Sequence, residues 1–215
     1  MQYKRILVLA PHTDDGELGC GGTINRFCKE GSTVHYVAFS TCRRSLPAGT
    51  PPDALEKEVK KATKILGIPS SNLILFDYDV RVFNTLRQQL LDDMIRLKNE
   101  INPDLILAPS LNDTHQDHQV IANESIRAFK EVSIWGYEMP WNNLSFNTQC
   151  FVELQEEHVS VKAKALEEYE SQKHRRYLNK EFVYSLANIR GIQINVKYAE
   201  AFEIIRTVVK LPSSL

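Results

Sequence analysis

Two short segments of this sequence gather histidines and carboxylates. Residues 11–17 read PHTDDGE and hold one imidazole and three carboxylates, and residues 112–118 read NDTHQDH and hold two imidazoles and two carboxylates. Catalytic zinc sites commonly use three protein ligands drawn from His and Asp or Glu, and they leave a further position open for water. The two segments therefore predict a metal site, provided that the fold brings them to one point.

The carboxylates of the first segment favour hydrolysis by activated water. A carboxylate beside a metal can deprotonate the bound water, whose pKa falls to about 7 in favourable sites. Asp14 and Asp15 could each be the ligand or the base, and their spacing alone does not decide between the roles. Asp14, Asp15 or Asp117 could instead cap helices, but capping accounts for only one acid per helix. The sequence has no GxSxG elbow, so nucleophilic acyl transfer has little support.

The elements that must position these segments alternate between strand and helix. Apolar runs predict strands over residues 4–10, 33–39, 72–76 and 104–108, and helical spacing predicts helices over 16–31, 53–66 and 85–101. This alternation indicates right-handed βαβ units in a parallel, doubly wound sheet. Ligands bind beyond the carboxyl ends of the strands in such sheets, and both histidine-bearing loops leave the sheet at that edge.

The last third of the chain is less regular. It predicts strands near 133–137, 150–154 and 201–205 and a charged helix from 156 to about 171. With no repeat and no linker, residues 1–215 are expected to form a single α/β domain with a Rossmann-like, mostly parallel sheet and helices on both faces.

Composition excludes several classes of partner. Lys and Arg number 26 against 27 Asp and Glu, for a formal charge of -1, so no nucleic-acid partner is expected. The first apolar run is far shorter than the roughly 20 residues of a membrane span. The four cysteines form no CxxC pair, which fits a reducing, cytoplasmic location. The oligomeric state, including a homo-oligomer, stays open.

A known family is visible in these segments. ILVLAPHTDDGELGCGGTI resembles the AHPDDE signature of the PIG-L/LmbE-like zinc-dependent N-acetylglucosamine deacetylases, with Thr13 where that family usually has Pro. PDLILAPSLNDTHQDHQVIANES is similar to the HxDH segment of the family, and the likeness continues through KAKALEEYESQ and RGIQINVKYAEAF. The resemblance covers most of the chain, and its paired motifs are specific.

The resemblance implies a residue for each role in a deacetylase. It implies Zn²⁺ bound by His12, Asp15 and His118, Asp14 as general base, and His115 as a charged hydrogen-bond donor and acid. It also implies a small N-acetylated amino-sugar substrate. Asp117 could orient the His115 imidazole, or it could only cap the helix that starts there.

The candidates for substrate binding are weaker. Arg43 or Arg44 follows the second strand, where family members often place an Arg, and Arg81 lies in a later loop. Trp141 belongs to a segment rich in aromatic and amide groups that would suit a sugar. Each of these residues could equally be ordinary surface or core.

Two other classes of function remain open. Two His and one carboxylate also describe non-haem iron oxygenases, although Asp14 and His115 suit hydrolysis better. A non-catalytic sugar- or nucleotide-binding module is the other alternative, and the complete set of site residues argues against it. The ligand set would also accept Fe²⁺, Co²⁺ or Ni²⁺ in place of Zn²⁺.

Overall fold

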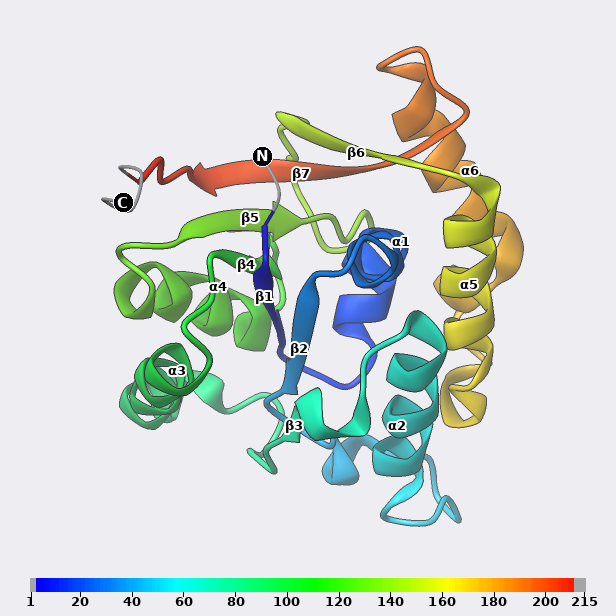
Figure 1. Cartoon of the computed structure of the whole chain (residues 1–215). Coiled ribbons are helices and arrows are strands. Elements are labelled where there is room, and N and C mark those ends of the chain that lie inside the picture. The colour runs from blue at the N-terminus through cyan, green and yellow to red at the C-terminus, as the bar shows by residue number, and fades with distance from the viewer. Residues whose placement is uncertain (1–2, 211–215) are drawn as a thin grey trace.

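The computed structural model describes residues 3–210 and shows one seven-stranded sheet with helices on both faces (Figure 1). The strands are β1 (Arg5–Ala10), β2 (Thr33–Ala38), β3 (Leu73–Leu75), β4 (Leu105–Pro109), β5 (Ser133–Tyr137), β6 (Cys150–Leu154) and β7 (Tyr198–Arg206). The α-helices of the described chain are α1 (Asp15–Lys29), α2 (Ala54–Leu66), α3 (Arg87–Ile101), α4 (Gln116–Ala128), α5 (Glu156–Glu167) and α6 (Lys180–Ile192).

The sheet has the order β3-β2-β1-β4-β5-β7-β6 and is mostly parallel. β1 pairs in parallel with both β2 and β4, and only β7 runs antiparallel to its neighbours, β5 and β6. The expected Rossmann-like α/β class is therefore confirmed. The chain order reverses beside β1, which places the loops after β1 and β4 next to each other at the carboxyl edge.

Two hydrophobic cores hold the layers together. Ile6, Val8 and Ala10 of β1 face one core, with buried residues of α1, α2 and α5, whereas Leu7 and Leu9 face the other, with α3 and α4. Figure 1 shows the same division of the helices between the two faces of the sheet. Successive residues of β1 thus face the two cores in alternation, which explains why this strand is apolar throughout.

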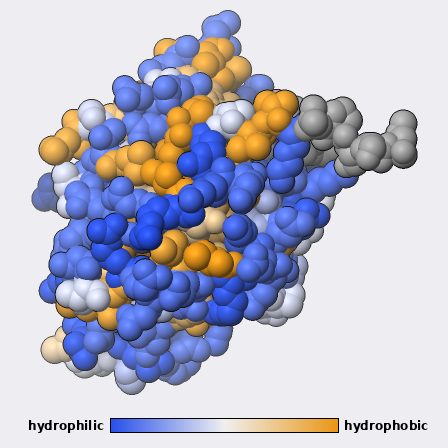
Figure 2. All heavy atoms as spheres, turned by 90° about the vertical axis from the view of Figure 1, so that its left-hand side faces the viewer, coloured by the Kyte–Doolittle hydropathy of each residue, from blue (hydrophilic) through white to orange (hydrophobic). Residues whose placement is uncertain are grey.

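The outer surfaces of the helices are polar. Figure 2 views the molecule from the side of α3 and α4, where hydrophilic side chains cover most of the surface and hydrophobic ones lie in scattered groups. α3 turns Leu90, Met94 and Leu97 inward, at helical spacing. No helix within residues 3–210 is both long and apolar enough to cross a bilayer.

The last third differs most from expectation. The helix expected to reach about residue 171 ends at Glu167, and short 3₁₀ turns follow it. Helix α6, which buries Val183, Ala187 and Gly191, was not predicted from the sequence. A Cβ at Gly191 would lie 2.7 Å from the backbone of Lys197. Gly191 therefore lets α6 pack closely against the residue that precedes β7. The stripe of buried residues on α6 is narrow, so the helix is hard to recognise in the sequence.

Candidate active site

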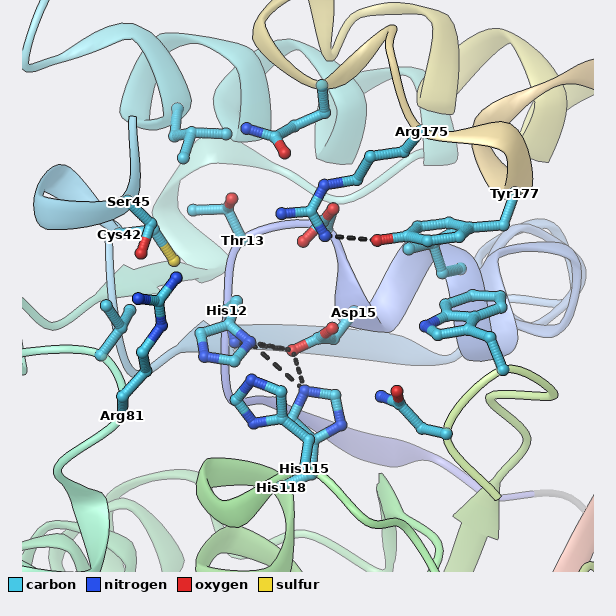
Figure 3. Close-up of a pocket in the computed structure, with 17 residues that line it drawn as sticks. His12, Thr13, Asp15, Cys42, Ser45, Arg81, His115, His118, Arg175 and Tyr177 are labelled. Atoms are coloured by element: carbon cyan, nitrogen blue, oxygen red, sulfur yellow. Dashed lines mark hydrogen bonds and ion pairs between the residues drawn. The ribbon is translucent and has the colours of Figure 1, made fainter. Parts of the chain in front are cut away.

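Residues from the loops after β1 and β4 meet at the carboxyl edge of the sheet. The His12 Nδ1 atom lies 3.1 Å from Asp15 Oδ2 and 3.3 Å from His118 Nε2 (Figure 3). The distance between Asp15 Oδ2 and His118 Nε2 is 3.2 Å. Tetrahedral ligands at 2.0–2.1 Å from a zinc ion would be about 3.3 Å apart. The three atoms therefore form a donor triangle that fits a metal ion.

The electrostatics of this triangle favour positive charge. Burial alone would raise the pKa of Asp15, but the charges of His118 and His12 hold it well below its usual range. Burial alone would lower the pKa of His118, but Asp15 and Asp113 raise it to about 10. The point between these three side chains therefore suits a cation.

A second carboxylate supports each of the two imidazoles. Asp117 Oδ2 lies 3.1 Å from His12 Nε2, and Asp113 Oδ2 lies 2.7 Å from His118 Nδ1. Carboxylate–histidine pairs of this kind fix the ring orientation and tautomer of metal-binding histidines. Asp113 was not among the residues expected at the site, although it lies in the same NDTHQDH segment.

This arrangement corrects the expected part played by Asp117. Its carboxylate contacts His12 and accepts a 2.6 Å hydrogen bond from the Arg81 backbone, whereas only its backbone N–H reaches His115, at Nδ1 (3.2 Å). The Asp117 carboxylate therefore neither orients His115 nor caps α4. His115 itself is the N-cap residue of that helix.

We expect Asp113→Asn to weaken metal binding about 10- to 100-fold, as is typical when an outer carboxylate partner is lost. The amide keeps the shape of Asp113 but removes the charge that favours metal binding through His118. Titration of the apoprotein with Zn²⁺ against a competing chelator measures the change. Asp104→Asn is the control and should bind zinc as the wild type does, because Asp104 lies at the amino end of β4 and its carboxylate accepts from the Lys4 and Arg5 backbone amides.

His115 has a single free ring nitrogen. Because Nδ1 accepts the Asp117 backbone N–H, a neutral ring carries its proton on Nε2 and can donate only from there. Burial, together with the charges of His118 and His12, lowers the pKa of His115 to about 4. All three imidazoles, of His12, His115 and His118, offer nitrogens within 4.8 Å of one another.

Asp14 is buried beside the donor triangle and lines the same cavity. It occupies the N-cap position of α1, but its side chain makes no capping hydrogen bond, so the capping interpretation is not supported. Burial and the neighbouring charge of Asp15 raise the pKa of Asp14. A carboxyl group with a raised pKa beside a metal site is suited to accept and return a proton.

A buried cluster of two tyrosines and a glutamate supports the loop between β1 and α1. The hydroxyls of Tyr36 and Tyr169 lie 2.9 Å and 2.7 Å from the carbonyl oxygen of Thr13, and both contact the carboxyl group of Glu17. Burial raises the pKa of Glu17 to about 8. Gly16 lies so close to Tyr36 that a Cβ would come within 2.4 Å of its ring. The cluster fixes the backbone that carries Asp14 and Asp15.

We expect Tyr169→Phe to lower the free energy of unfolding by about 1–3 kcal/mol, because it removes a hydroxyl that satisfies buried acceptors. Urea denaturation measures this loss. Tyr184→Phe, on α6 and away from the cluster, should change stability by less. Equal losses in the two variants would show that the Tyr169 hydroxyl has no special part in holding the loop.

The donor triangle opens into a cavity of about 210 Å³. Of the expected substrate residues, Arg81 and Trp141 line it. Arg43 and Arg44 do not: they are exposed and form ion pairs with Asp77 (3.0 Å) and Asp79 (2.8 Å). These carboxylates satisfy both guanidinium groups at the surface, away from the cavity wall.

One wall of the cavity was not expected from the sequence. Gln172, Arg175 and Tyr177 come from the segment between α5 and α6, which holds two short 3₁₀ turns and was partly read as the end of a helix. Burial would lower the pKa of Arg175, but the hydrogen bond to Tyr177 and the charge of Asp14 raise it. The signal available in the sequence was the QKHRRY run, which without the fold resembles ordinary charged surface.

Fold and site together define an α/β protein with a candidate metal centre at the carboxyl edge of its sheet. The profile of the PIG-L family, GlcNAc-PI de-N-acetylase, matches residues 7–129. The uncharacterized deacetylase YaiS of Escherichia coli (strain K12) is 33% identical over 178 residues, which cover 78% of this chain and 91% of that protein. The chain therefore belongs to the PIG-L family of deacetylases.

Solved structures share the fold. The N,N'-diacetylchitobiose deacetylase of Pyrococcus horikoshii superposes with a TM-score of 0.76 at 22% identity, over 94% of this chain and 84% of that one. GalB, a 4-carboxy-2-hydroxymuconate hydratase of Pseudomonas putida KT2440, also reaches 0.76, at 20% identity over 98% of this chain and 100% of that one. Because one fold carries both a deacetylase and a hydratase, the reaction must be argued from the site.

Proposed function

We propose that this protein is a metal-dependent hydrolase that removes the acetyl group from an N-acetylated amino sugar or a conjugate of one. The observation that carries the proposal is the donor triangle of His12, Asp15 and His118, with Asp14 beside it in a small cavity. Membership of a deacetylase family supports the reaction, and the sugar named for the Pyrococcus horikoshii enzyme supports the substrate class.

Each residue has a part in the proposed reaction. A divalent metal held by the triangle would supply charge that polarises the acetyl carbonyl and lowers the pKa of a water molecule. Asp14 takes the proton of the attacking water, and its raised pKa lets it hold that proton and return it to the leaving nitrogen. The Nε2–H group of His115 donates a hydrogen bond to the carbonyl oxygen as negative charge develops there.

The identity of the metal, the carboxylates that support its histidines and the substrate contacts belong to the same proposal. We take Zn²⁺ as the metal because two imidazoles and one carboxylate are a frequent zinc set, which also accepts Fe²⁺ and other divalent ions. Asp113 and Asp117 hold the two ligand rings from outside. Arg81 and Trp141 remain the proposed substrate contacts among those expected from sequence, whereas Arg43 and Arg44 are not retained.

The test is acetate release from N-acetylglucosamine and its methyl glycoside, measured together with the metal content of the purified protein. We expect activity to be lost after treatment with a chelator and restored by Zn²⁺. Absence of acetate from every N-acetylhexosamine in fully metal-loaded protein would refute the proposal. Oxygen uptake with a 2-oxoacid would instead identify the iron oxygenase alternative.

A further inference from the structure

A buried carboxylate contacts the loop after β4 from outside the cavity. Glu203 of β7 is 6% exposed and does not belong to the cavity lining. Its Oε2 atom accepts a 2.5 Å hydrogen bond from the Ser110 hydroxyl, and its Oε1 atom accepts from the Asn112 side-chain amide (3.2 Å) and the Asn147 backbone (3.0 Å). A glutamine would present an amide donor to these donors, so at least one of the three hydrogen bonds would be lost or reversed.

Glu203 reaches this loop across a glycine of β5. Because β5 lies between β4 and β7 in the sheet (Figure 1), the Glu203 side chain must pass over β5 to contact Ser110. Gly136 of β5 is the register partner of Glu203, and a Cβ at Gly136 would lie 3.2 Å from Ser110 Cα and 3.5 Å from Glu203 Cβ. The absence of a side chain at Gly136 therefore leaves the space in which the two side chains meet.

The turn that Glu203 contacts is the one that carries Asp113. The Asp113 backbone N–H donates to the Ser110 carbonyl (3.3 Å), and the Asn112 backbone N–H donates to the Ser110 hydroxyl (3.1 Å). Glu203 thus binds the first and third residues of the turn at residues 110–113. Because side-chain hydrogen bonds of this kind set the backbone conformation of short turns, the Glu203 carboxylate fixes the direction of the backbone at Asp113.

Asp113 in turn holds both histidines of this loop. It is 1% exposed, its Oδ1 atom accepts the His115 backbone N–H (2.8 Å), and its Oδ2 atom lies 2.7 Å from His118 Nδ1. Since each carboxylate oxygen is bound to a different residue, a change of backbone direction at Asp113 would break one contact or displace the His118 ring. The position of the His118 Nε2 atom in the donor triangle therefore depends on the turn at residues 110–113.

We propose that Glu203 is a positioning residue for the metal centre, which holds the turn at residues 110–113 so that Asp113 directs the His118 ring toward the donor triangle. This inference rests on the metal centre of the proposed function. None of the three hydrogen bonds that Glu203 accepts comes from a metal ligand, so its effect passes through Asp113. Loss of the Glu203 carboxylate should change the geometry and affinity of the site while every ligand is still present.

The first measurement is the zinc affinity of the apoprotein, titrated against a competing chelator. Glu203→Gln should weaken zinc binding by about 3- to 10-fold, less than the loss of the Asp113 carboxylate, because Glu203 acts through Asp113. With Co²⁺ in place of zinc, the visible absorption bands depend on ligand geometry, and we expect Glu203→Gln to shift them. Ser110→Ala removes the other end of the same contact and should change both measurements in the same direction, also where Glu203→Gln folds poorly.

Glu124→Gln is the matched control for the loss of a buried carboxylate. Glu124 of α4 is 0% exposed and accepts from Arg87 and Arg127, so this variant should lose stability but keep the wild-type zinc affinity and cobalt bands. A double-mutant cycle tests the route. Adding Glu203→Gln to Asp113→Asn should weaken zinc binding by less than about twofold further, and fully additive losses would show that Glu203 acts independently of Asp113 and would overturn the inference.

A measurement on metal-free protein separates this inference from the proposed function. The proton on His118 Nδ1 faces Asp113, and NMR of histidine-labelled apoprotein detects it. Glu203→Gln should shift this signal and speed its exchange with water at least about threefold, because the Asp113 contact is held less firmly, whereas Glu124→Gln should leave the shift unchanged. An unchanged His118 signal or an unchanged zinc affinity in folded Glu203→Gln would refute the positioning role, even in an active deacetylase. Failure of the wild type to bind zinc would refute the metal centre itself.

Discussion

Asp14→Asn is expected to lower kcat for acetate release by about 10²- to 10⁴-fold, the usual contribution of a positioned general base. The amide has nearly the shape of the carboxylate but cannot accept the proton of the attacking water. Asp14 lies outside the donor triangle, so metal content should stay at the wild-type level. Steady-state kinetics and elemental analysis of the same preparation provide the two measurements.

Asp15→Asn is the matched comparison, because it changes the adjacent carboxylate in the same way. Asp15 Oδ2 lies within 3.2 Å of a nitrogen of both His12 and His118, so this variant should lose metal as well as activity. If instead Asp14→Asn lost the metal and Asp15→Asn kept it, the roles assigned to the two carboxylates would have to be exchanged.

His118→Ala is expected to weaken metal binding by more than about 100-fold, beyond the range seen when an outer partner is removed. The substitution deletes one of three donors and also leaves the Asp113 carboxylate buried without its 2.7 Å partner. Acetate release should fall to background, and added Zn²⁺ should restore it only poorly. Zinc titration against a chromogenic chelator measures the loss.

His174→Ala serves as the control for a general effect of removing an imidazole. His174 is exposed and lies outside the cavity lining, so its loss should change neither metal content nor turnover. Zinc bound by His118→Ala at full stoichiometry and with unchanged affinity would show that His118 is not a ligand, and the third imidazole, that of His115, would then be the next candidate.

The sequence predicted the fold best where burial alone determines which residues are apolar. The strands β1 and β4 are buried on both faces, so their continuous apolar runs located them to within a residue or two. Their adjacency follows from the doubly wound strand order, which reverses beside β1, and this brings residues 11–17 and 112–118 together. The convergence of the two histidine-bearing segments was therefore predictable from strand order and residue type, whereas the choice of Asp15 over Asp14 as the third donor came from the family resemblance alone.

The contacts between the supporting carboxylates and the two histidines depend on backbone geometry, which the spacing of residues in the sequence does not determine. Asp113 and Asp117 lie two positions either side of His115, yet their carboxylates reach His118 and His12 because of the turn that precedes α4. Arg175 was missed for a similar reason, since it lies between two short 3₁₀ turns in a segment without a periodic pattern. Such contacts are set by tertiary packing, and a linear pattern does not determine them.

The donor triangle joins parts of the chain that are far apart: His12 and His118 are separated by 106 positions. An unfolded chain would not hold these atoms together, so a metal would bind the native state almost exclusively. By mass action, free metal at 100 times its dissociation constant would add about 2.7 kcal/mol to stability. The melting temperature would then rise with the free metal concentration. A chain short of metal would be less stable and would therefore be cleaved more readily by proteases.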